Sequence, residues 1–181
     1  MIIFMLYHFS YLTKQNWGSK MLEEQIMSEL NKSLEAECLL EEPLTKGKQI
    51  FMRIDKKCLK HVIGFLKNKG FNHLQAITGL EVEDGIELLY HLSSGNMLLT
   101  IRVKLPKNEA VAPSITDIVR GATLYEREIH DLLGLKFGEH PNLEPLILPD
   151  DWPKDMYPLR KSHITEKEKP KKERKNLYSS H

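Results

Sequence analysis

The side chains best suited to chemistry are gathered in one short stretch: Glu126, Arg127, Glu128, His130 and Asp131. Residues four apart share a face of a helix, so Glu126 would lie beside His130, and Arg127 could pair with Asp131. Glu126 and His130 could supply two ligands to a metal ion, with His140 and Asp150 as the nearest candidates to complete the set. The pattern favours the alternative, a polar helix face that forms ion pairs with a partner protein or with the following loop.

Polar residues beyond this stretch each allow a structural interpretation beside a chemical one. His140 precedes a proline and is either a proton relay or, as we expect, a loop imidazole hydrogen-bonded to the backbone. Asp150 and Asp151 could form a carboxylate pair for acid–base catalysis, but a turn or capping role is the simpler interpretation. We expect Trp152 to anchor an interface, since large aromatic side chains dominate interface energies.

The sequence lacks the signatures of common enzyme classes: GxGxxG, a P-loop, GxSxG, HExxH and CxxC. This absence weighs against an autonomous enzyme. Lys and Arg total 26 against 25 Asp and Glu, and a net charge of +1 gives no strong field for attracting nucleic acid. Cys38 and Cys58 are too few for a zinc site or a disulfide framework, so we expect two reduced, partly buried thiols.

Neither a membrane span nor a signal peptide is predicted. The longest apolar run, Met1–Tyr7, is far shorter than the roughly 18 residues that a spanning helix needs. No basic residue precedes this run and no small-residue cleavage site follows it. We treat residues 1–20 as an uncertain N-terminal extension, with Met21 as an alternative start.

Residues 21–134 are expected to form an α+β domain. Apolar periodicity predicts helices over Met21–Glu42 and over Asp55–Lys69, the second capped by Asp55 and Gly70. Short apolar or alternating runs predict an edge strand and three further strands, one interrupted at Gly79, with a hairpin turn over 93–96 and a loop over 106–113. These strands are Gln49–Ile54, Phe71–Val82, Ile86–Leu92 and Met97–Leu105. The order of elements favours a small, mostly antiparallel sheet packed by helices.

The domain is expected to end with the clearest helix of the chain, Ala122–Leu133, with Gly134 as its C-cap. Residues 135–161 are rich in proline and yet apolar, so we predict an extended segment without regular structure that must lie against a surface. Arg160 and Lys161 either neutralise carboxylates of a partner or are solvated. Residues 162–181 form a charged tail that mixes lysine with glutamate, which suits an acidic partner groove or solvent better than nucleic acid.

The stretch Tyr125–Lys161 resembles the signature of the thirty-kilodalton subunit of respiratory complex I, the C-subunit family of the NADH:quinone oxidoreductases. That signature is an ERE-x-x-D helix end with a glycine, then a Phe, a His-Pro loop and a closing PLRKD. The matching residues are Glu126, Arg127, Glu128, Asp131, Gly134, Phe137, His140, Pro141, Pro158, Leu159, Arg160 and Lys161. The resemblance implies that these residues, with Leu148 and Trp152, form an interface.

The sequence departs from this signature at three places. Gly138-Glu139 stands where many members have Glu-Gly, so the His-Pro loop is expected to turn differently. Ser162 replaces the final aspartate. The stretch Leu148–Pro153 is similar to the homologous subunit of membrane-bound [NiFe] hydrogenases and related archaeal ferredoxin-linked complexes, including sulfur-reducing ones.

The resemblance implies a non-catalytic subunit that binds no cofactor itself. Its expected partners are a [NiFe]-hydrogenase-type large subunit and a small iron–sulfur subunit, which would carry the iron–sulfur clusters and the nickel–iron centre. It would lie peripherally at the cytoplasmic face of the cell membrane and reach the membrane arm through these partners.

Three alternatives stay open, one within the same family and two of a different class. The chain could be the corresponding subunit of an NADH or F420H2:quinone oxidoreductase. It could be an autonomous metal-dependent enzyme using Glu126, His130 and Asp150. It could also be a free-standing module that binds nucleic acid through its tail, which salt-sensitive binding to a duplex would reveal.

Overall fold

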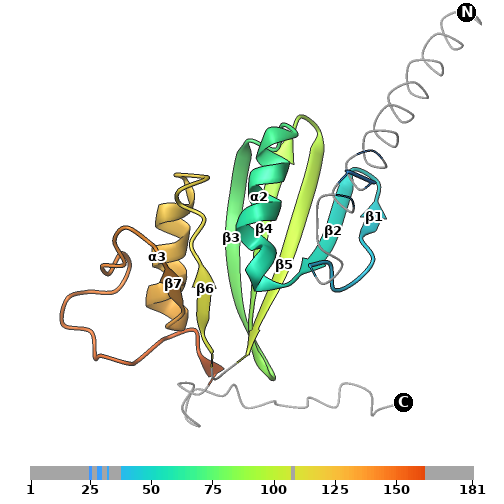
Figure 1. Ribbon diagram of the computed structural model, residues 1–181. Helices are drawn as coiled ribbons and strands as arrows, with labels where there is room; N and C mark the ends of the chain where they lie inside the picture. Colours follow the sequence, from blue (N-terminus) through green and yellow to red (C-terminus); the bar gives the residue numbers. More distant parts are fainter. Residues whose placement is uncertain (1–24, 26–27, 30–31, 33–37, 107–108, 162–181) are drawn as a thin grey trace, which may run out of the picture.

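A five-stranded sheet forms the centre of the molecule. The computed structural model describes residues 25, 28–29, 32, 38–106 and 109–161. The strands are β1 (Leu44–Lys46), β2 (Gln49–Ile54), β3 (His73–Val82), β4 (Gly85–Ser94) and β5 (Met97–Pro106). Their order in the sheet is β1-β2-β5-β4-β3, and every pair is antiparallel except β2 with β5 (Figure 1). The predicted α+β class with a mostly antiparallel sheet is therefore confirmed.

One face of this sheet is covered by a helix. Asp55 accepts a hydrogen bond from the Lys57 N–H and so caps the short turn η1 (Lys56–Cys58), which continues into α2 (Leu59–Asn68). Helix α2 packs on one face of the sheet and runs roughly along its strands (Figure 1), burying its apolar stripe: Leu59, Val62, Ile63 and Leu66. On β5 the alternate residues Leu99, Ile101, Val103 and Leu105 are fully buried, as the period-two pattern predicts.

Two details of the predicted sheet were wrong. Strand β2 is not an edge strand, because β1 pairs with its outer side and β5 with its inner side. Strand β3 runs through Gly79 without interruption. A Cβ at Gly79 would lie 2.6 Å from Leu133 Cδ1, so the glycine allows close packing there rather than a break. The predicted β4–β5 hairpin is present, with only Gly95 and Asn96 between the strands.

A smaller unit adjoins β3. It consists of α3 (Ala122–Leu133) and two short parallel strands, β6 (Val111–Pro113) and β7 (Lys136–Gly138). The bounds of α3 and the left-handed C-cap at Gly134 (φ 65°) are as predicted. The strands were missed, because each has three residues and contains or adjoins proline or glycine; Ala112 and Phe137 at their centres are buried. Beyond β7, residues 139–160 contain no helix or strand.

The thiol prediction was also wrong, because Cys38 and Cys58 form a disulfide, with their Cα atoms 5.7 Å apart. The bond is local to the start of α2, where Asp55 N donates to the Cys38 carbonyl at 3.0 Å and Leu39 bridges to Ile54. Residues 38–42 are consequently not helical, contrary to the predicted helix over 21–42. Most of that helix, the extension 1–20 and the tail 162–181 lie outside the described residues. No described helix is long and apolar enough to cross a membrane.

Candidate functional site

Asp131, in the last turn of α3, holds the start of the extended segment. Its side chain is nearly buried, with 6% of the residue exposed. Its Oδ2 accepts hydrogen bonds from the N–H groups of Leu146 at 2.6 Å, Ile147 at 2.8 Å and Leu148 at 3.4 Å. The predicted pairing with Arg127 is not made. The carboxylate instead fixes three consecutive amides of a segment that has no secondary structure of its own.

Two arginines bind backbone carbonyls of the same region. Arg127 donates to the carbonyls of Glu144 (2.8 Å) and Pro145 (2.7 Å). Arg160 donates to the Leu133 carbonyl at 2.6 Å, at the C-terminus of α3, and its Nη1 lies 3.8 Å from Glu81 Oε1. Arg160 is therefore held mainly by its own chain, and the contact with a partner's carboxylates stays a prediction. These contacts tie both ends of the segment to α3.

Glu126 is a fully buried carboxylate on α3. Its Oε1 accepts the Ile115 N–H at 2.9 Å, whereas Oε2 has no hydrogen-bond partner among the described residues. The nearest cationic candidate is His140, whose Nε2 lies 4.0 Å from Oε2. Burial raises the pKa of this carboxyl, and the Ile115 N–H opposes the shift. Glu126 thus lies inside its own chain, and the interface role that the resemblance implied for it stays a prediction.

His140 is held by the backbone, as predicted. Its Nδ1 accepts the Asn142 N–H at 3.1 Å, so its Nε2 carries the proton and donates to the Thr123 carbonyl at 3.3 Å. Burial lowers the pKa of this imidazole, which is therefore neutral at pH 7. The approach to Glu126 is consequently not an ion pair. His140 and Glu126 together fix the loops that flank the N-terminal half of α3.

The metal ligands considered from the sequence are not assembled. His130 Nδ1 bonds to the Leu135 carbonyl at 2.8 Å, Glu126 is committed to Ile115, and Asp150 is exposed. Within the described ranges, no group of three or more His, Cys, Asp or Glu residues is placed to hold a metal ion.

The raised pKa of Glu126 has a consequence for stability. The unfolded chain releases this proton near the usual pKa of 4.5 and the folded chain only at higher pH. The free energy of unfolding should therefore fall as pH rises through this interval and stay lower above it. Glu126→Gln retains the oxygen facing Ile115 but cannot titrate, so it should lose the part of the pH dependence of unfolding that comes from Glu126. Urea unfolding at about pH 4 and about pH 8 should show that the free energy of unfolding falls less towards pH 8 in Glu126→Gln than in the wild type. Glu128→Gln, on the exposed side of α3, is the matched control; parallel pH curves for wild type and Glu126→Gln would show that Glu126 titrates normally.

Glu139 stands at a position where the family signature has glycine. Its φ is 65°, a left-handed conformation that glycine adopts more readily. The pattern has glycine at this position, and this chain has glutamate. Lys60 Nζ binds the Glu139 carboxylate at 2.6 Å and Asp117 at 3.1 Å, so the side chain ties the His-Pro loop to α2.

The outer side of the extended segment exposes apolar side chains. Leu146 is 38% exposed, Ile147 55%, Met156 41% and Leu159 57%. Leu148 and Trp152 are half-buried, and the Trp152 indole N–H donates to the Met156 carbonyl at 2.8 Å. In Figure 1 this segment loops away from the five-stranded sheet on the far side of α3. Of the other residues assigned to an interface, Phe137 is buried, Gly134 and Pro158 are half-buried, and Glu128, Pro141 and Lys161 are exposed.

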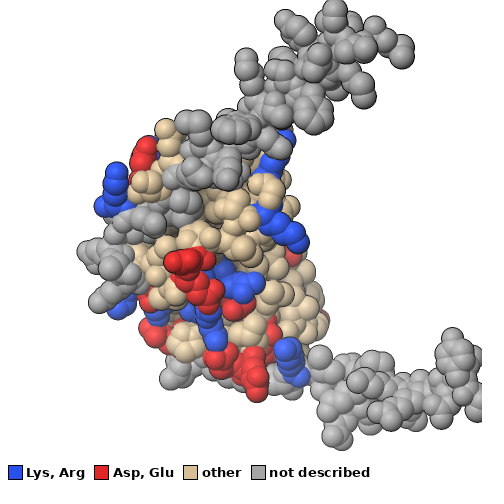
Figure 2. Space-filling view, turned by 90° about the vertical axis from the view of Figure 1, so that its right-hand side faces the viewer, with Lys and Arg blue, Asp and Glu red and all other residues tan. Residues whose placement is uncertain are grey.

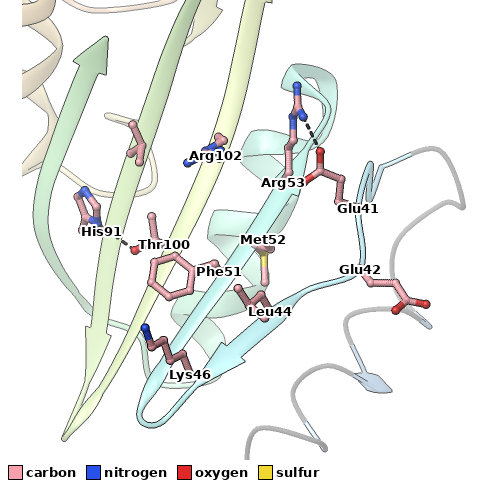
Figure 3. A pocket seen from close by; sticks show the side chains of 11 residues that line it. Glu41, Glu42, Leu44, Lys46, Phe51, Met52, Arg53, His91, Thr100 and Arg102 are labelled. Carbon is pink, nitrogen blue, oxygen red and sulfur yellow. Dashed lines mark hydrogen bonds and ion pairs between the residues drawn. The ribbon is translucent and has the colours of Figure 1, made fainter.

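Sequence reasoning missed a hollow of about 450 Å³ on the open face of the sheet. Phe51, Leu89 and Thr100 line it, with His91 hydrogen-bonded to Thr100 at 3.0 Å (Figure 3). Its rim mixes cations and carboxylates, including the Arg53–Glu41 pair at 2.5 Å. Figure 2, which views the molecule from the side of β1 and β2, likewise shows basic and acidic residues interspersed. On β2, β4 and β5 every second residue points away from the core. These residues form the open face, and the period-two pattern of the sequence could have identified them.

Comparisons with known proteins agree on one family. Residues 52–169 match the family described as "Respiratory-chain NADH dehydrogenase, 30 Kd subunit". The chain is 35% identical over 115 residues to the C subunit of F(420)H(2) dehydrogenase from Methanosarcina mazei, covering 61% of this chain and 72% of that protein. It is 33% identical over 112 residues to the C/D subunit of NADH-quinone oxidoreductase from Phocaeicola vulgatus, covering 60% of this chain and 21% of that much longer protein.

Among solved structures, the fold is similar to a chain of an archaeal respiratory membrane complex, the membrane-bound sulfane sulfur reductase. The TM-score is 0.68 at 24% identity, and the match covers 79% of this chain and 84% of that one. At this identity the likeness establishes the shared fold.

Proposed function

The chain belongs to the family of the 30 kDa subunit of respiratory-chain NADH dehydrogenase, and from this premise we propose that it is a non-catalytic structural subunit of a membrane-bound, ion-translocating oxidoreductase. One observation carries the proposal: the polar residues that could do chemistry are used to shape the extended segment. Asp131, Arg127 and Arg160 bind its backbone. The segment in turn exposes apolar side chains that need a partner surface.

The partner we propose is the large subunit of the same complex, of the [NiFe]-hydrogenase type, with a small iron–sulfur subunit nearby. The Phocaeicola vulgatus relative supports contact with another large component, because its name joins the C and D subunits in one chain. Fusion favours subunits that are neighbours in the complex. We further propose that iron–sulfur clusters and any nickel–iron centre belong to those partners, and that the complex places this chain at the cytoplasmic face of the membrane.

A second candidate within the family is the corresponding subunit of an F420H2- or NADH-oxidising complex. The name of the Methanosarcina mazei relative favours it. The similarity of Leu148–Pro153 to hydrogenase and sulfur-reducing complexes favours the first candidate. Metal analysis of the isolated complex separates a nickel-containing hydrogenase from the others.

The proposal predicts that Leu148→Ala with Trp152→Ala releases the chain from its complex without unfolding it. Both side chains are half-buried on the segment, and interface anchors of this kind contribute about 2 kcal/mol or more each. The tagged chain, purified in mild detergent from native membranes, should recover the other subunits at roughly a tenth of the wild-type amount or less.

The matched control is Leu44→Ala with Leu80→Ala, two exposed apolar residues on edge strands of the sheet. It should recover the complex normally. Loss of the thermal unfolding transition in the free Leu148/Trp152 variant would assign these residues to the chain's own fold. Normal recovery of the complex by that variant would remove the segment as the docking surface.

A further inference from the structure

The extended segment presents more exposed carboxylates than exposed amines to its surroundings. Its two arginine neighbours, Arg127 and Arg160, direct their guanidinium groups at backbone carbonyls of the same chain. Over residues 135–161 the exposed carboxylates are Glu139, Glu144, Asp150, Asp151 and Asp155, against the exposed amines of Lys136, Lys154 and Lys161. None of Asp150, Asp151 and Asp155 forms an ion pair with another residue that the structure describes. The outward charge is therefore acidic.

Exposed carboxylates and exposed apolar side chains both occur along residues 146–159, and hydrogen bonds hold the backbone of this stretch in place. The Trp152 indole donates to the Met156 carbonyl, and Asp155 adopts a left-handed conformation with φ 63° between them. This turn presents Asp155 and Met156 together. Leu159 is fixed to the end of α3, because its N–H donates to the Leu132 carbonyl at 3.0 Å. A surface fixed in this way loses little conformational entropy on binding.

We propose, resting on the function proposed above, that this acidic apolar surface (Ile147, Asp150, Asp151, Asp155, Met156 and Leu159) docks into an apolar groove bordered by lysines and arginines on the neighbouring oxidoreductase subunit. The apolar side chains supply the buried centre of the contact. The carboxylates form its rim, where opposite charge on the partner sets orientation and association rate. Acidic residues on the partner at this place would instead repel the segment.

Carbodiimide cross-linking tests the charge complementarity directly, because it joins a carboxylate to an amine only when the two are in contact. It is applied to the intact complex purified from native membranes, followed by peptide mass spectrometry. We expect Asp150, Asp151 or Asp155 to be joined to lysines of another subunit. Cross-links from these aspartates only to lysines of the chain's own tail, residues 167–175, would overturn the proposal.

Charge reversal separates this proposal from the proposed function. Asp150→Lys with Asp151→Lys and Asp155→Lys should lower recovery of the complex about tenfold at low salt, and less at high salt as charges are screened. The matched control, Glu42→Lys with Glu83→Lys, reverses two exposed charges away from the segment and should have no effect. If Ile147→Ala with Leu159→Ala releases the chain while the reversed aspartates do not, the charge complementarity fails and the docking function stands. If neither variant releases it, both fail.

Discussion

Replacing Asp131 by alanine should free the extended segment from α3 while the five-stranded sheet stays folded. The carboxylate accepts three backbone N–H groups in a nearly buried position, and no other described side chain binds those amides. Losing charge-assisted hydrogen bonds at such a site costs roughly 2–3 kcal/mol. Hydrogen exchange at the amides of Leu146, Ile147 and Leu148 should accordingly become about 30- to 150-fold faster.

Two further variants show whether charge and position account for the effect. Asp131→Asn retains an oxygen acceptor without the charge, so its exchange rates should lie between those of wild type and Asp131→Ala. Asp117→Ala removes an exposed carboxylate whose described partner is Lys60, and it should leave exchange at 146–148 unchanged. Unaltered protection in Asp131→Ala would mean that the segment is held by its apolar contacts alone.

Gly134→Ala is expected to destabilise the opposite end of the segment by about 2–4 kcal/mol. Gly134 ends α3 with φ 65°, where a Cβ is strained, and an added Cβ would overlap the Tyr157 ring, with Cδ2 at 2.6 Å. The ring must move, and it takes with it the turn in which Arg160 N donates to the Tyr157 carbonyl. Urea unfolding, together with exchange at Leu159 and Arg160, measures the effect.

Gly121→Ala is the matched control, because Gly121 precedes the first turn of the same helix. Its φ is −61°, and an added Cβ there meets nothing within 4 Å. We expect its unfolding free energy to change by less than about 1 kcal/mol. Equal stability of the two alanine variants would show that Tyr157 does not pack against Gly134 in solution.

Much of the fold was predictable because it follows from local patterns. The stripe of α2, the alternation of β5 and the glycine at the end of α3 each reflect a period or a conformation that a few residues specify. The order of the strands was not predictable in this way. The pairing of β2 with β5 depends on contacts between distant residues, and nothing in Gln49–Ile54 distinguishes a strand with one neighbour from a strand with two.

The candidate site was found for a partly wrong physical reason. The sequence indicated Glu126, Arg127 and Asp131 because they are charged, and charged helix residues usually face solvent. Glu126 and Asp131 are buried, and all three bind backbone of the same chain. Their partners are carbonyl and amide groups, which every residue carries, so residue types alone could not reveal the pairing. The resemblance in Tyr125–Lys161 indicated the same residues as members of an interface, and that role stays a prediction.

The parallel pairing of β2 with β5 has a consequence for the chain as it is synthesised. The β1–β2 hairpin leaves the ribosome first, carrying Ile50, Met52 and Ile54, which the finished sheet buries almost completely. Their neighbour in the sheet, β5, follows only after α2, β3 and β4 have emerged. Until then these apolar side chains and an unpaired strand edge stay open to other chains. Among the described strands, β2 consequently has to wait for a sheet neighbour that is far away in the chain, and during that time it is exposed to aggregation.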